Sequence, residues 1–260
     1  MAHLYYRIHS AFWNGVRQLC LGGLRFGFAR PMVVDRGRVL IFSPHQDDET
    51  LGCGGLITLK RRRGANVHVA FLTDGSRGCG DDSPWTAEQL SEIRRVEAVA
   101  ALDLLGVPAS NLTFMGASDG ALDALGPDQE QSLLLALEGL LQSLQPDEVL
   151  LPFHGDRHPD HKAAHRLVLE SLKRSGMSPL VHQYPVWALE SPWRSGLRWP
   201  ELKGARYLKI DKVVSLKRQA LGEYRSQVEP QPPHGRLGLP SSLLALFLKD
   251  YELYFPGGEP

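Results

Sequence analysis

The chain alternates short apolar, β-rich runs with longer amphipathic stretches, and this alternation limits the folds that it can adopt. The apolar runs predict strands at Val39–Ser43, Asn66–Thr73, Asn111–Met115, Glu148–Phe153 and Leu180–Ala188. The stretches between them predict helices at Glu49–Arg63, Pro84–Gly106, Asp128–Gln145 and Lys162–Arg174. Strands that alternate with helices form a parallel sheet covered on both faces. We therefore expect an α/β fold with a Rossmann-like, mostly parallel sheet and an active site at the carboxyl ends of its strands.

The pattern is looser after Pro192. Tyr207–Ile210 predicts an edge strand, Val214–Ser226 a helix and Ser241–Phe255 a closing amphipathic helix. A segment rich in proline and glycine, Gln227–Pro240, is expected to be a loop that covers the site. Because no linker divides the chain, we expect residues 37–260 to form a single domain after an arm of residues 1–36.

The composition excludes several classes of protein. The 260 residues carry 29 basic and 29 acidic side chains, so no charge excess favours bulk nucleic-acid binding. The three cysteines are scattered without CxxC spacing, which argues against a disulfide framework and favours a reducing compartment. No apolar run of about 18 residues predicts a spanning helix, and the N-terminus lacks a signal-peptide pattern. We therefore expect a cytoplasmic protein that does not bind nucleic acid.

Residues 1–30 are basic and aromatic, and no acidic side chain precedes Asp35. Apolar side chains recur there at helical spacing, at Tyr5, Ile8, Phe12, Val16 and Leu19. One interpretation is an amphipathic helix that lies peripherally on an anionic membrane surface. Glycines within the segment weaken a long helix. The alternative is therefore packing on the protein's own domain or on a second subunit of a homo-oligomer.

The segment "SPHQDDETLGCGG" (Ser43–Gly55) places an imidazole and three carboxylates directly after the first predicted strand. His45 and Asp48 are three residues apart, which lets both side chains converge on one point from a tight turn. Imidazole nitrogen and carboxylate oxygen are normal ligands of a zinc-like divalent ion. Asp47 does not readily share that point, so it is left to act on a ligand of the metal. Taken alone, the motif is equally compatible with a capped helix start.

A second segment, "FHGDRHPDH" (Phe153–His161), follows the fourth predicted strand and repeats this pattern. His158 and His161 are again three residues apart, with Asp160 between them. By itself the segment is compatible with a surface loop. Two such turns at the carboxyl ends of strands would together supply three metal ligands and leave one position open, as catalytic zinc requires.

The two motifs, "PHQDDETLGCGG" and "HPDH", together resemble those of the LmbE/PIG-L family of zinc-dependent N-deacetylases. Members of that family act on N-acetylglucosamine attached to an inositol, a lipid, a thiol precursor or an antibiotic scaffold. The resemblance covers roughly Val39 to Gln227 and includes "TDGSRG", "RRVEAVAALDLLG", "SDGAL" and "LKRQALGEYRSQ". The chain departs from the family pattern at Gln46, where proline is usual, and at Tyr224, where histidine is frequent.

The resemblance implies a role for each matching position. The implied metal ligands are His45, Asp48 and His161, and the implied general base is Asp47. His158 would stabilise the oxyanion, with Asp160 orienting it, while Arg77 and Asp119 fall on positions that contact substrate. The roles of Asp156 and Arg157 in the same loop stay open. Arg94, Arg95 and Glu97 are expected to form ion pairs on a helix face.

These residue types suit the hydrolysis of an acetamide. A bound zinc ion lowers the pKa of water to about 7, and a carboxylate that is not a ligand can take up the proton. Asp160 beside His158 is expected to raise the pKa of that imidazole and favour its charged form. The expected activity is removal of the N-acetyl group from an N-acetylglucosamine-type conjugate, with Zn²⁺ or another divalent transition metal. The alternatives are hydrolysis of another small-molecule amide and an inactive relative that binds a sugar or lipid.

Overall fold

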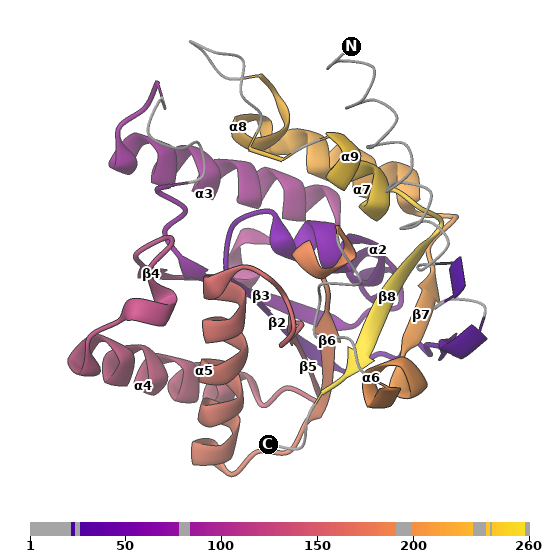
Figure 1. The fold of residues 1–260 in the computed structure, drawn as a ribbon, viewed down its shortest axis with the longest axis horizontal. Coiled ribbons are helices and arrows are strands. Elements are labelled where there is room, and N and C mark those ends of the chain that lie inside the picture. The colour runs from indigo at the N-terminus through magenta and orange to yellow at the C-terminus, as the bar shows by residue number, and fades with distance from the viewer. Residues whose placement is uncertain are drawn as a thin grey trace, which may run out of the picture.

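One mixed sheet forms the centre of the computed structural model, which describes residues 22–23, 27–77, 84–190, 199–230, 238–239 and 241–257. In these ranges the sheet has eight strands in the order β1-β7-β8-β6-β5-β2-β3-β4 (Figure 1). Their bounds are β1 Arg30–Pro31, β2 Arg38–Ser43, β3 Asn66–Thr73, β4 Leu112–Ala117, β5 Glu148–Pro152, β6 Leu180–Tyr184, β7 Arg206–Lys209 and β8 Tyr251–Pro256. Strands β4, β3, β2, β5 and β6 are parallel, and β8 runs antiparallel to both β6 and β7.

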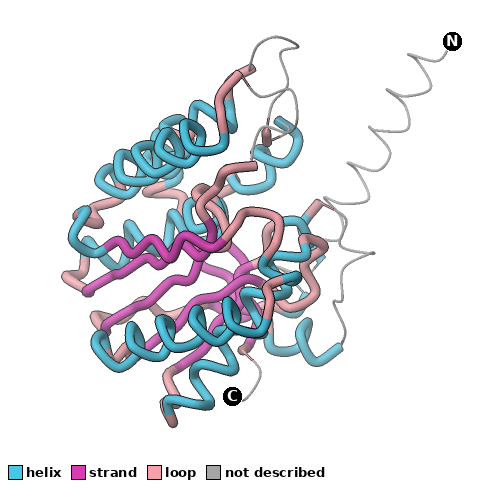
Figure 2. The backbone as a smooth tube through the Cα atoms, turned by 90° about the vertical axis from the view of Figure 1, so that its left-hand side faces the viewer, coloured by secondary structure: helices cyan, strands magenta, loops and turns pink. Residues whose placement is uncertain are grey.

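Helices cover both faces of this sheet (Figure 2). Helices α4 and α5 lie on one face, and α2, α3 and α7 lie on the other. The helix bounds are α2 Asp48–Arg62, α3 Ala87–Leu104, α4 Pro127–Leu144, α5 Pro159–Ser175, α6 Trp199–Gly204, α7 Val214–Glu223, α8 Arg225–Val228 and α9 Ser241–Phe247. Short 3-10 turns are η2 Ala109–Asn111, η3 Leu122–Ala124 and η4 Trp187–Leu189. The predicted α/β fold, with a mostly parallel sheet and helices on both faces, is confirmed.

The central strand β2 shows why both layers form. Val39 and Ile41 point into the core beneath α2, α3 and α7, whereas Leu40 and Phe42 point into the core beneath α4 and α5. All four are almost fully buried. A strand that is apolar on both faces is stable only when each face is covered.

The glycines of "GCGG" allow α2 to pack closely on the elements around it. A Cβ atom at Gly52 would lie 2.3 Å from Cδ2 of Tyr184, and one at Gly55 would lie 2.4 Å from Cγ2 of Ile210. Any larger residue at these positions would push α2 away from Tyr184 of β6 and from Ile210, which follows β7. The segment therefore serves helix packing.

The C-terminal part of the chain differs from the sequence-based expectation. The closing helix predicted at Ser241–Phe255 is wrong, because only Ser241–Phe247 is helical and Tyr251–Pro256 forms β8. β8 pairs with β6 and β7, so contacts with distant strands override local helical periodicity. β7 is consequently an internal strand, since β1 pairs with its other edge. The helix predicted at Val214–Ser226 is interrupted at Tyr224.

Most of the predicted N-terminal arm, residues 1–21 and 24–26, lies outside the described residues. Arg30–Pro31, at the end of that arm, pairs with β7 and belongs to the sheet. Among the described helices, none is both long and apolar enough to cross a membrane. The loop predicted at Gln227–Pro240 also lies largely outside the described residues, and α8 extends to Val228 at its start.

Candidate metal centre and active site

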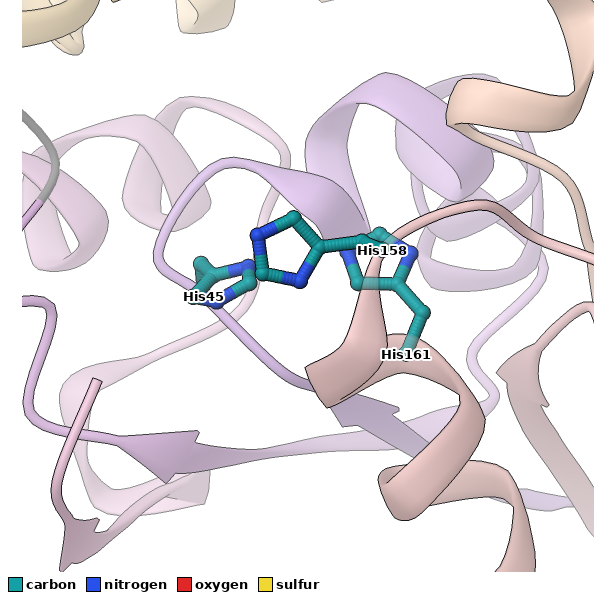
Figure 3. A group of neighbouring side chains, drawn as sticks. All are labelled: His45, His158 and His161. Atoms are coloured by element: carbon teal, nitrogen blue, oxygen red, sulfur yellow. The ribbon is translucent and has the colours of Figure 1, made fainter. Parts of the chain in front are cut away.

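Two strand-to-helix turns meet at one edge of the sheet. β2 and β5 are parallel neighbours, so their carboxyl ends lie side by side. The turn after β2 leads through His45 into α2, and the segment after β5 leads through His158 into α5. Figure 3 shows the imidazoles of His45, His158 and His161 gathered between these elements. The two motifs that are distant in sequence therefore form one site.

The carboxylate of Asp48 joins the two motifs. Its Oδ2 atom lies 3.1 Å from Nδ1 of His45 and 3.1 Å from Nε2 of His161. Four-coordinate zinc with bonds of about 2.0–2.1 Å places its ligand atoms about 3.3 Å apart. Both separations at Asp48 are close to that spacing. The three residues that the resemblance implies as metal ligands thus converge in the structure.

The histidines form a compact cluster of nitrogen donors. The ring centroids lie 4.8 Å apart for His45 and His158, 5.5 Å for His45 and His161, and 5.2 Å for His158 and His161. One ligand atom from each lies within 4.8 Å of the others, which suits a metal ion. A second group with this property comprises His45, Asp119 and Asp160. His45 belongs to both groups and lies at the centre of the donors.

The surroundings of His161 fit a bound cation. Its side chain is fully buried, yet neither ring nitrogen has a hydrogen-bond partner in the described part of the chain. Nδ1 lies 3.3 Å from Oδ2 of Asp156, on the side of the ring away from Asp48. Burial alone would lower the pKa of His161, but the carboxylates of Asp48 and Asp156 raise it to about 9. A buried imidazole whose ring nitrogens have no hydrogen-bond partner, and which lies next to carboxylates, is suited to bind a divalent ion.

His45 also has carboxylates on its second nitrogen. Nε2 lies 3.0 Å from Oδ2 of Asp160 and 3.2 Å from Oδ1 of Asp119. Burial would lower the pKa of His45, but Asp119, Asp160 and Asp48 together raise it well above its usual value. Imidazoles that bind metals commonly donate their other N–H group to a carboxylate. The geometry of His45 therefore combines a ligand nitrogen with a supporting hydrogen bond.

The structure corrects the expectation that Asp160 orients His158. The Asp160 carboxylate accepts hydrogen bonds from the backbone N–H groups of Gly120 (2.8 Å) and Leu122 (3.0 Å), and it faces His45. Only the backbone N–H of Asp160 meets His158, donating to Nδ1 at 3.2 Å. The loop after β4 and the first residue of η3 supply these donors, and this contact between distant segments has no local sequence signal.

The expected charged form of His158 is corrected as well. Burial lowers the pKa of His158, and the nearby His45 and His161 lower it further. Because Nδ1 accepts the hydrogen bond at the start of α5, the neutral ring carries its proton on Nε2. His158 is therefore suited to donate a hydrogen bond as a neutral imidazole.

Asp47 differs from Asp48 in conformation and protonation. Its backbone has φ 145° and ψ −28°, a strained combination for a residue other than glycine. Its side chain makes no capping hydrogen bond to α2 and is almost fully buried. Burial raises the pKa of Asp47 to about 8, although the charge of Arg94 opposes this. A carboxylate with a raised pKa is a stronger base than an ordinary one.

Arg94 lies beside the site residues, whereas the sequence predicted only an ion pair on a helix face. This residue of α3 is buried, and its guanidinium lies 3.5 Å from Asp47 and 3.8 Å from Asp119. It also donates to the backbone carbonyl of Gln46 at 2.8 Å. The sequence signal that could have found it was the "R-x-x-E-A" element of the family resemblance, which singled out the helix without fixing the orientation of Arg94.

The two residues implied as substrate contacts lie beside each other. The backbone N–H of Arg77 donates to Oδ2 of Asp119 at 2.9 Å. Asp119 is buried and faces His45, whereas Arg77 is exposed and its side chain passes close to Gly120. Asp119 therefore supports the histidine cluster, and Arg77 lies at the outer rim.

A buried site of histidines and aspartates at the carboxyl edge of such a sheet has the donors to hold a metal ion, and comparison with known proteins identifies the family. Residues 40–172 match the family described as "PIG-L: GlcNAc-PI de-N-acetylase". Since the match spans half of the chain, the protein belongs to this family.

Two curated relatives are deacetylases by name. A probable N-acetyl-alpha-D-glucosaminyl L-malate deacetylase 2 from Bacillus subtilis (strain 168) is 31% identical over 140 residues, covering 52% of this chain and 61% of the relative. A 1D-myo-inositol 2-acetamido-2-deoxy-alpha-D-glucopyranoside deacetylase from Rhodococcus jostii (strain RHA1) is 30% identical over 176 residues, covering 60% of this chain and 58% of the relative. The chain thus spans less than two thirds of the length of these relatives.

A solved structure shares the fold over most of the chain. The N,N'-diacetylchitobiose deacetylase from Pyrococcus horikoshii, in complex with its inhibitor MPG, superposes with a TM-score of 0.62 at 24% identity. The similarity covers 92% of this chain and 84% of that protein. It therefore extends past the family match, which spans residues 40–172.

Proposed function

We propose that this protein is a metal-dependent N-deacetylase that removes the acetyl group from an N-acetylglucosamine-type conjugate. The observation that carries the proposal is the position of the Asp48 carboxylate, 3.1 Å from nitrogens of both His45 and His161, with Asp47 next to it in the chain. The names of the relatives support an amino-sugar amide as the substrate. Both relatives act on N-acetylated glucosamine joined to a small group, by their names.

The metal would be held by Nδ1 of His45, Oδ2 of Asp48 and Nε2 of His161. Bound there, a divalent ion such as zinc would lower the pKa of water and polarise the amide carbonyl. The chemistry of these donors fits zinc, although the same set tolerates other divalent transition metals. Asp160 and Asp119 would then hold His45 through its second nitrogen, and Asp156 would do the same for His161.

Asp47 would act as the general base. It is buried next to Asp48 in the chain, its raised pKa suits proton uptake, and its carboxylate is not the one that lies 3.1 Å from His45 and His161. In amide hydrolysis, the attacking water must lose a proton and the leaving nitrogen must gain one. Asp47 can accept the first proton and deliver it to the nitrogen as the C–N bond breaks.

His158 would stabilise the oxyanion that develops on the carbonyl oxygen. Its Nδ1 is fixed by the N–H of Asp160, so Nε2–H is the group available to donate. One well-placed donor of this kind contributes about 3–4 kcal/mol to transition-state stabilisation. Arg77, at the outer rim, and Asp119 would contact hydroxyl groups of the sugar or its aglycone.

The remaining expectations from the sequence also become proposals. Residues 37–260 would form one catalytic domain that also uses β1, and the small-molecule conjugate would be its substrate partner. Residues 1–30, most of which lie outside the described residues, would make a peripheral membrane contact or a homo-oligomer contact, and the protein would be cytoplasmic.

The test is acetate release from a panel of substrates by the zinc-loaded protein. The panel contains free N-acetylglucosamine and its inositol-linked, malate-linked, nucleotide-linked and lipid-linked forms, with Asp47→Asn measured in parallel. Acetate release by wild type that is lost in the variant supports the proposal and ranks the aglycones. Release from unrelated acetamides alone would favour hydrolysis of another small-molecule amide. Binding of a sugar without release of acetate would favour an inactive binding protein.

A further inference from the structure

Tyr224 connects the C-terminal helices to the first motif. It lies between α7 and α8, and its side chain is fully buried. Its hydroxyl donates a hydrogen bond to Oε1 of Glu49, a residue of the first turn of α2 that is also fully buried. This is the position at which the family pattern frequently has histidine, so the contact is a feature of this chain.

The carboxylate of Glu49 in turn holds the backbone of Asp47. Oε2 accepts the N–H of Asp47 at 3.1 Å, while Oε1 accepts the hydroxyls of Tyr224 and Thr50. Ser43 Oγ lies 3.3 Å from Oε2, but its single proton has a shorter partner in the carbonyl of His45 at 2.7 Å. The donors on the two oxygens therefore fix the carboxylate between Tyr224 and Asp47.

The backbone that Glu49 holds is strained. Asp47 has φ 145°, in the region that favours glycine, and a conformation of this kind costs about 1–3 kcal/mol. Such strain persists only where surrounding contacts over-determine it. The hydrogen bond from Asp47 N–H to the Glu49 carboxylate is one of these contacts. Because the two residues are only two positions apart, a small rotation of the Glu49 side chain changes the direction of the Asp47 side chain.

We propose that Tyr224 is a positioning residue for Asp47, which it holds through Glu49 in the strained conformation that directs its carboxylate to the metal centre. The proposal rests on the proposed function, in which Asp47 is the base. The Tyr224 hydroxyl holds Oε1 of Glu49 in place. Because the carboxylate is rigid, Oε2 is then held in place as well, and Oε2 accepts the N–H of Asp47. Tyr224 itself touches neither a proposed ligand nor the base.

The same segment has a separate contact that maintains the fold. Ser226 donates through its N–H (2.8 Å) and its hydroxyl (2.7 Å) to the carboxylate of Glu97 in α3. This attachment of α8 to α3 does not involve the phenol. Removal of the Tyr224 hydroxyl therefore leaves the helix docked, and it leaves Oε1 of Glu49 with the Thr50 hydroxyl but without the donor that links it to α7 and α8.

The experiment compares wild type, Tyr224→Phe and Tyr224→His as zinc-loaded proteins. In Tyr224→Phe, kcat for acetate release should fall about tenfold per bound metal, with KM and metal content unchanged, because the base is displaced. Tyr224→His, which restores a donor to Glu49, should recover kcat to within about threefold of wild type. Equal kcat in wild type and Tyr224→Phe would overturn the proposal.

Tyr254→Phe is the matched control, because Tyr254 is also fully buried and donates to a carboxylate, that of Glu252, at 2.8 Å. Glu252 accepts the N–H groups of Gly55 and Leu56 in the middle of α2, one or more helical turns beyond Asp47 and Asp48, so this variant should lose stability but keep kcat. Crystal structures of the variants give a readout that needs no substrate. Asp47 should keep its positive φ in wild type and Tyr254→Phe and leave it in Tyr224→Phe. An unmoved Asp47 would refute the positioning role, whereas an inactive wild type would refute only the proposed function.

Discussion

Oδ2 of Asp156 lies 3.3 Å from Nδ1 of His161, while Oδ2 of Asp48 lies near the other ring nitrogen, Nε2. The same Asp156 oxygen accepts the backbone N–H groups of Val186 and Trp187, each at 3.0 Å. The segment after β6 therefore holds the Asp156 carboxylate in place beside His161. The sequence left the role of Asp156 open, and this geometry indicates that it orients His161, one of the proposed metal ligands.

We predict that Asp156→Asn weakens metal binding by about 10–100-fold, because loss of such a partner leaves the ligand ring poorly oriented. Competition of the loaded protein with a zinc chelator measures the change. Asp147→Asn is the control, since Asp147 pairs with Arg38 at the amino end of β2, where both side chains are half-exposed. Unchanged zinc affinity in Asp156→Asn would show that the contact does not support the ligand.

Asp47→Asn and Asp48→Asn should separate catalysis from metal binding. Asp47→Asn should retain zinc and lose about 10²–10⁴-fold in kcat, the usual contribution of a general base. Asp48→Asn should lose zinc, because Oδ2 of Asp48 lies 3.1 Å from a nitrogen of each of the two proposed histidine ligands. Metal content per protein and acetate release, measured on the same samples, distinguish the two. Zinc loss in both variants would place Asp47 among the ligands instead.

Much of the fold and of the site follows from local sequence. Each His/Asp motif directly follows an apolar strand, and parallel strands present their carboxyl ends on one edge, so His45 and His161 had to converge if the strands were neighbours. The capping box at Thr86, in which the Thr86 hydroxyl accepts Gln89 N–H, is equally local. These features need only short-range rules and the topology of an α/β sheet.

The features that the sequence did not predict depend on partners far along the chain. β8 forms because β6 and β7 offer open edges, and its buried Glu252 is satisfied by Lys217 and by N–H groups of α2. Asp160 faces His45 because the loop of Gly120 offers it backbone donors. Neither partner is identifiable from residues near in sequence, and for the same reason the burial of Arg94 was not predicted.

The stability of the fold should fall on acidification because of His182. This residue of β6 is largely buried, and burial lowers its pKa to about 4, with the charges of Lys60 and Arg206 contributing. The unfolded chain, with an ordinary pKa of about 6.5, takes up a proton first as pH falls, so the folded state loses about 2 kcal/mol by about pH 5. Above about pH 6.5 both states are neutral and the effect vanishes.

Urea unfolding of wild type and His182→Gln at about pH 7.5 and about pH 5 measures this term. The variant has no group that takes up a proton at this position. Between about pH 7.5 and about pH 5, its free energy of unfolding should therefore decrease by about 2 kcal/mol less than that of wild type. An identical loss in both proteins would show that His182 titrates normally in the folded state.

Lys60 lies in the core, although it belongs to the group of basic residues in the last turn of α2, where lysine is usually exposed. It is fully buried near the end of α2, where its ammonium group pairs with the buried Glu148 of β5 and, at 2.7 Å, with Asp35. Lys60→Met should destabilise the protein by about 3–5 kcal/mol, because it leaves the Glu148 carboxylate buried without its cation. The double variant Lys60→Met/Glu148→Leu should recover most of that loss, since apolar replacement of a buried pair is often neutral. Guanidinium unfolding of the three proteins tests this. If the double variant is as unstable as the single one, packing around Lys60 and not the orphaned charge of Glu148 determines the cost.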